Sequence, residues 1–152
     1  MHIHSRVMTD PAAIKRFALA GHAKVTLKSL ATEQHYTYEI TKADESRGGD
    51  TWFVRVLTDR DLFVYAGIVR SNDLRLRLTA KSHYGDDAGC IKAFRYFFSH
   101  LMQGQVASQL EVRHEGHCGR CNRPLTHPSS IDRGIGPDCW EQMGMGAAER
   151  SF

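Results

Sequence analysis

The spacing of apolar residues changes along the chain, and this change predicts where helical structure gives way to strands. Near the N-terminus, Ile14, Phe17 and Ala18 recur at helical intervals and form one apolar stripe. Asp10 precedes this stripe as a suitable N-cap, and Gly21 follows it as a residue that often ends a helix. The pattern therefore predicts a packing helix over about residues 10–20.

Beyond this helix the apolar period becomes two, which is typical of strands with one buried face. Glycine, asparagine and aspartate separate the alternating segments, so the connections are short turns. Short connections favour antiparallel neighbours, and the sequence thus predicts a meander of about five strands. The expected strands are residues 24–28, 35–40, 52–57, 62–69 and 74–78.

A second helix is predicted over about residues 87–103, because Ile91, Phe94, Phe98 and Leu101 share one face. Residues 110–113 alternate again and form a short strand that leads into a cysteine cluster. The predicted fold class is α+β, with an antiparallel meander and two packing helices. We expect an α+β domain over residues 1–110, a small module resembling a zinc ribbon or treble clef over 111–143, and a flexible tail over 144–152.

Composition narrows the class of protein only slightly. The 152 residues are 41% hydrophobic and 24% charged, as in an ordinary globular protein. No segment approaches the roughly 18 apolar residues of a membrane span, and the first residues lack the apolar run of a signal peptide. A cytoplasmic location is expected, and no membrane partner. The net charge of +3 permits contact with nucleic acid without requiring it.

Three of the four cysteines lie close together, and their spacing predicts a metal site. Cys118 and Cys121 form a Cys-x2-Cys knuckle, and Cys139 begins a predicted helix. A structural zinc ion takes four ligands, so one histidine is expected to complete the site. His114, four residues before the knuckle, is the preferred candidate, and His117 and His127 remain alternatives.

The same segment resembles an uncharacterised domain family found in bacteriophages, prophages and some bacteria. The resemblance rests on the CGRCNRPLT opening at 118–126, the PSSI step at 128–131 and the closing GIGPDC at 134–139. Asn122 departs from the glycine usual in that family, although asparagine tolerates the same left-handed backbone. The HEG entry before Cys118 is also similar and favours His114. The resemblance implies metal binding and no established activity.

Enzymatic function is not expected. The sequence has no GxSxG, P-loop or HExxH motif, and three clustered cysteines favour a metal over a redox pair. His83, Asp86 and Asp87, the residues nearest to a nuclease site, read as a loop and a helix cap.

Binding is the expected activity, and arginines are its candidate residues. A strip with Arg75, Arg77 and Lys81 could contact an acidic partner, because the two arginines alternate with leucines on one strand face. Three more arginines of the zinc module extend this set: Arg120, Arg123 and Arg133. We expect a phage-type binding protein for nucleic acid or a nucleoprotein complex. The alternative is a phage inhibitor of a host defence complex, resembling an anti-CRISPR, which acts by protein–protein binding in the host cytoplasm. The oligomeric state is open.

Overall fold

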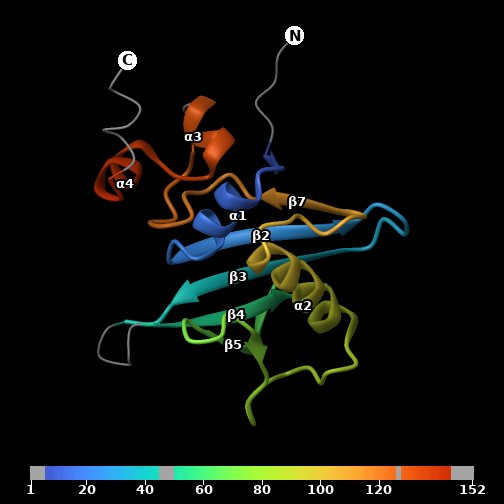
Figure 1. Cartoon of the computed structure of the whole chain (residues 1–152). Helices are drawn as coiled ribbons and strands as arrows, with labels where there is room; N and C mark the ends of the chain where they lie inside the picture. The colour runs from blue at the N-terminus through green and yellow to red at the C-terminus, as the bar shows by residue number, and fades with distance from the viewer. Residues whose placement is uncertain (1–5, 45–49, 126–127, 145–152) are drawn as a thin grey trace.

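One antiparallel sheet organises the chain in the computed structural model, which describes residues 6–44, 50–125 and 128–144. Its seven strands have the spatial order β1-β7-β2-β3-β4-β5-β6 (Figure 1). The strands are β1 (Val7–Met8), β2 (His22–Ser29), β3 (His35–Lys42), β4 (Thr51–Leu57), β5 (Phe63–Arg70), β6 (Leu76–Arg77) and β7 (Leu110–His114). The helices are α1 (Pro11–Ala18), α2 (Gly89–Met102), α3 (Pro128–Arg133) and α4 (Pro137–Gln142).

The expected α+β class is confirmed, but the expected count of about five strands is wrong. The sheet gains β1, whose two residues are too few to show a period, and β7, which the sequence placed outside the meander. β7 pairs with β2 along five residues, so the chain returns after α2 to the first strand of the meander. This pairing links residues more than 80 positions apart, a long-range contact that alternation cannot predict.

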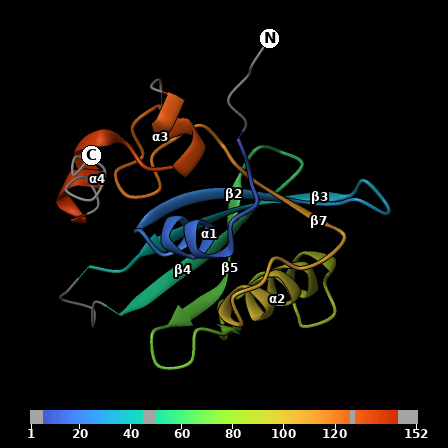
Figure 2. The same ribbon diagram turned by 45° about the horizontal axis from the view of Figure 1, so that its top comes forward.

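Helices α1 and α2 pack on the same face of the sheet, which is called the covered face below (Figures 1 and 2). Two aromatic side chains of that face bind the helices directly. The Tyr38 hydroxyl donates to the carbonyl oxygen of Cys90 in α2 at 2.7 Å, and Trp52 Nε1 donates to the carbonyl oxygen of Leu19 after α1 at 3.2 Å. Each bond is formed by a covered-face side chain whose neighbours in sequence face the other way. The alternation therefore fixes both the register and the helix positions.

The core under the two helices is apolar and continuous. From α2 it takes Phe94, Phe97 and Phe98, and from α1 it takes Ile14 and Phe17, all at most 2% exposed. The stripes predicted for both helices are confirmed by this burial. Cys90 at the start of α2 also belongs to this core, since it is 5% exposed and packs as a small hydrophobic residue.

The C-terminal segment joins the rest of the molecule more closely than a boundary at residue 110/111 suggests. That boundary falls inside β7, which lies between β1 and β2 in the sheet. The buried residues Cys118, Ile135 and Cys139 belong to the same hydrophobic cluster as the sheet and α1. The described buried residues of the module therefore extend the core of the sheet. Of the expected flexible tail, residues 145–152 lie outside the described part of the chain.

Candidate metal centre

The three cysteines expected to bind metal come together in space. The Sγ atoms of Cys118, Cys121 and Cys139 all lie within 4.8 Å of one another. Tetrahedral zinc with Zn–S bonds of about 2.3 Å separates its sulfur ligands by roughly 3.8 Å, so the three thiols are placed to ligate one ion with small movements. Among the described residues, no other histidine, cysteine or carboxylate joins this group.

Two local structures position the three thiols. Cys118 and Cys121 stand at either end of a tight turn, in which the Asn122 N–H donates to the Cys118 carbonyl oxygen at 2.9 Å. Asn122 has φ of 67°, so asparagine occupies the left-handed conformation expected where the resembling family has glycine. Cys139 lies in α4, and Pro137 occupies the first turn of that helix as the sequence predicts.

The electrostatics of the cluster favour a bound cation. Burial opposes ionisation of Cys118, but backbone N–H groups of Gly136, Cys121 and Arg120 point at its sulfur and lower the pKa of the thiol. At Cys139, burial and the two neighbouring cysteines raise the pKa to about 11. A metal ion between the sulfurs would supply a positive charge that stabilises the ionised form of the Cys139 thiol.

His114, the preferred fourth ligand, lies elsewhere. Its ring is fully buried on the covered face, and both nitrogens contact backbone groups. Nδ1 accepts from the Gly116 N–H at 2.9 Å, so Nε2 carries the proton and donates to the Ile131 carbonyl oxygen at 2.5 Å. No ring nitrogen is left for a metal in this arrangement, and the structure does not bring His114 to the thiols. The sequence places it correctly at the end of β7 but cannot show this pair of bonds.

The other two candidate histidines are His117 and His127. His117 is half-buried, and its Nδ1 lies 3.2 Å from the Glu115 carbonyl oxygen, but it does not join the thiol group either. His127 lies outside the described residues. His117, His127 and solvent are thus the alternatives for a fourth ligand.

Phe17 of α1 packs against the C-terminal segment, a contact that its place in the apolar stripe does not predict. A Cβ built on Gly119 would lie 2.5 Å from Phe17 Cδ1, and one on Gly134 would lie 2.7 Å from the same atom. Both distances are below any real contact, so these two glycines make room for the ring. The GIGPDC step and the Cys-x2-Cys knuckle therefore meet on one aromatic side chain.

The arginines proposed for partner binding are mostly engaged within the chain. In the C-terminal segment, Arg120 Nη1 donates to Gln142 Oε1 at 2.6 Å, and Arg123 forms an exposed pair with Asp138 at 3.8 Å. Arg133 lies over the Trp140 ring, with Cζ 4.3 Å from the centroid. These contacts tie loops of the module together and leave the arginines partly available at the surface.

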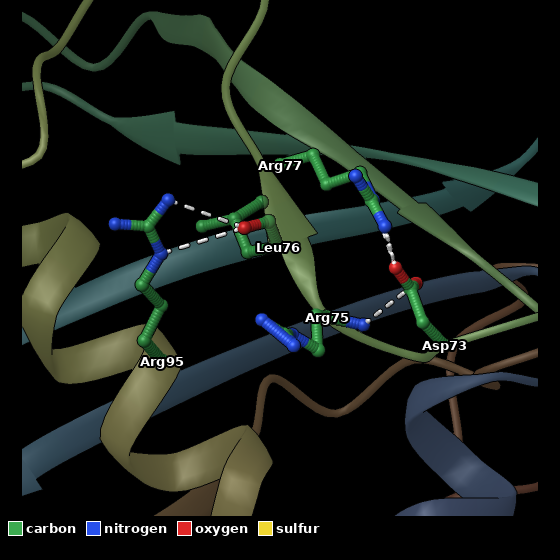
Figure 3. A network of polar contacts seen from close by, with 5 residues as sticks. All are labelled: Asp73, Arg75, Leu76, Arg77 and Arg95. Atoms are coloured by element: carbon green, nitrogen blue, oxygen red, sulfur yellow. Dashed lines mark hydrogen bonds and ion pairs between the residues drawn. The ribbon is translucent and has the colours of Figure 1, made fainter.

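The strip around β6 departs from the expected strand face. Leu74 has φ of 50° and the strand contains only Leu76 and Arg77, so Arg75 stands outside it. Arg77 pairs with Asp73, whereas Arg75 points toward Arg95 (Figure 3). The two arginine side chains therefore have different neighbours, although both are exposed on either side of the buried Leu76.

The remaining polar candidates have structural contacts. Arg95 donates to the Leu76 carbonyl oxygen and pairs with Asp86 at 2.6 Å (the first contact is drawn in Figure 3), so Asp86 anchors α2. The His83 N–H donates to the Tyr65 carbonyl oxygen at 2.9 Å. Lys81 is exposed and has no ion pair among the described residues.

Comparison with known proteins gives a family match for the C-terminal segment. The model of a family of unknown function, DUF6011, matches residues 108–144. This segment begins just before β7 and ends with α4, and so it contains all three clustered cysteines. The match supports a resemblance to an uncharacterised domain family. No curated protein and no solved structure gives a match. In the described part of the chain, no helix has the length and apolarity needed to cross a membrane.

Proposed function

We propose that the chain is a non-enzymatic binding protein of phage or prophage type, stabilised by one structural zinc ion and directed at nucleic acid or a nucleoprotein complex. The observation that carries the proposal is the convergence of three thiols from two distant segments. Cys118 and Cys121 reach Cys139 across an intervening loop that contains α3. In a short segment of this kind, a metal supplies stability that apolar burial alone cannot provide.

Zinc is preferred over other ions because of the donor set. Three thiolates select soft or borderline metals, and a cytoplasmic chain holds such cysteines reduced. Cys118, Cys121 and Cys139 supply three ligands, and a fourth comes from His117, His127 or water. His114 is assigned a supporting role, since its two backbone bonds connect β7 to α3 and to the loop before Cys118.

The choice of an anionic partner rests on charge. The chain carries a net charge of +3, and among the six arginine and lysine candidates Arg75 and Lys81 have no ion pair within the described residues.

Two measurements on the purified chain test this proposal. Metal analysis of protein never exposed to chelator should give about one zinc per chain, and Cys121→Ser should lower it severalfold. An electrophoretic mobility shift with mixed DNA and RNA should then show binding that weakens steeply with salt. Salt-independent capture of a protein partner, without nucleic-acid binding, would instead support the inhibitor alternative and sink the nucleic-acid part of the proposal.

A further inference from the structure

The face of the sheet opposite α1 and α2 carries no helix in the described part of the chain, and it is called the open face below (Figures 1 and 2). Solvated faces of antiparallel sheets normally present polar side chains. Here the centre is apolar and aromatic. Phe53 in β4 lies directly opposite Ile68 in β5, and the Phe53 and Tyr65 rings meet edge to face at 6.5 Å. All three side chains are half-buried, so solvent reaches part of each.

Cations surround this aromatic centre. Strand register and alternation place six on the open face: Lys24, Lys28, Arg55, Arg70, Arg77 and Arg113. Three of the arginines pair with nearby carboxylates, those of Glu39, Asp73 and Glu111. Lys24, Lys28 and Arg70 have no ion pair among the described residues.

The open face also carries a depression of about 370 Å³ over β7, β2 and β3. Its lining is polar and of mixed charge: Thr26, Lys28, Glu33, His35, Glu111 and Arg113. Thr26 in this lining shares a hydrogen bond of 2.7 Å with Thr37 on β3. Glu111 is already paired with Arg113, and Lys28 has no ion pair among the described residues.

We propose that the open face binds single-stranded nucleic acid, with bases stacked on Phe53 and Tyr65 and phosphates held by Lys24, Lys28 and Arg70. Aromatic rings on an exposed sheet accept any base through its π-face, and flanking cations follow the backbone. A duplex hides its base faces and cannot use the rings. An acidic protein surface would pair with the cations but would offer no planar group to stack on the rings. This inference rests on the proposed function and names the form of nucleic acid and its site.

The test is a fluorescence anisotropy titration of the full chain, purified with its metal. The probes are labelled oligothymidine and oligouridine of about 12 nucleotides, within the ~4–16 that one compact domain covers, and a duplex of equal length. Wild type is expected to bind both single strands at least tenfold more tightly than the duplex. Equal affinity for duplex, or no binding of single strands below about 100 µM, the weak limit of non-specific binding, overturns the proposal.

Two pairs of variants locate the site. Phe53→Leu with Tyr65→Leu removes the rings while keeping apolar contact with Ile68, and it should weaken single-strand binding at least tenfold, about 1.4 kcal/mol. Its control is Tyr96→Ala, an aromatic residue 42% exposed on α2, which should leave affinity unchanged. A folded double-leucine variant that binds like wild type refutes the stacking platform.

Charge reversal separates this face from the zinc module. Lys24→Glu with Lys28→Glu should weaken binding at least tenfold and reduce its salt dependence, whereas Lys92→Glu on exposed α2 surface should change affinity less than twofold. If Arg120→Glu with Arg123→Glu abolishes binding and the open-face variants do not, the inference fails and the proposed function stands. If wild type binds no nucleic acid at all, both fail together.

Discussion

Replacing His114 by alanine should destabilise the fold without removing the metal. The ring is fully buried and contacts Phe17 at 5.9 Å between ring centroids, while its nitrogens bond to the backbone of Gly116 and Ile131. Alanine leaves both backbone groups without their partner, at about 1–3 kcal/mol each, and opens a cavity. Because these costs overlap, we expect a total loss of about 3–5 kcal/mol, a large share of the stability of a domain this size.

The assay is urea unfolding of wild type and variant followed by tryptophan fluorescence, with metal analysis of the same samples. His35→Ala is the matched control, since His35 is exposed on β3 and should change stability by no more than about 0.5 kcal/mol. A His114→Ala protein that loses less than 1 kcal/mol, or that folds normally and no longer retains metal, would refute the structural role and restore His114 as a ligand.

The remaining predictions concern pH and packing. Burial, and then the charge of Arg6, lowers the pKa of His114 in the folded chain. The unfolded chain, in which this histidine has its ordinary pKa of about 6.5, therefore takes up the proton more readily. Stability should fall as pH drops from 7.5 toward 5.5, and it should fall less in His114→Ala. Unfolding curves of both proteins at the two pH values test this linkage. If it were absent, wild type and His114→Ala would lose the same free energy of unfolding between the two pH values. Gly119→Ala should lower the free energy of unfolding by about 1–3 kcal/mol, because its Cβ would clash with the aromatic ring of Phe17. Gly85→Ala, with open space around the new Cβ, should cost far less. Equal losses in thermal unfolding would contradict this account of the packing.

The sequence predicts the local structure of this chain well and its long-range pairing poorly. Apolar periodicity places α1, α2 and the four long strands, because each element buries one face and the period reveals it. β1 has two residues, too few for any period, and β6 keeps only two of the residues 74–78 that alternation predicts as a strand. The insertion of β7 between β1 and β2 depends on contacts between distant segments, which no local pattern contains.

The candidate site shows the same division. The Cys-x2-Cys spacing and the proline before Cys139 predict the three-thiol cluster, because metal ligands in short segments have a restricted geometry. The role of His114 depends instead on the Ile131 carbonyl oxygen, 17 residues away in α3. Likewise the exposure of Arg75 and Arg77 alternates with the leucines as expected, but the direction of Arg75 toward Arg95 of α2 involves a distant segment. Residues whose neighbours are local were predicted, and those whose partners are distant were not.

The central claim is that three thiolates hold one metal ion that ties the C-terminal segment to the sheet. Substitution with Co²⁺ tests it most directly, because thiolate ligation gives an intense charge-transfer absorption whose strength follows the number of sulfur ligands. Wild type should titrate to about one Co²⁺ per chain, zinc should displace it, and Cys118→Ser, Cys121→Ser and Cys139→Ser should each weaken the band. A wild-type chain that shows no thiolate band, or a band unchanged by any of the three substitutions, would contradict the account.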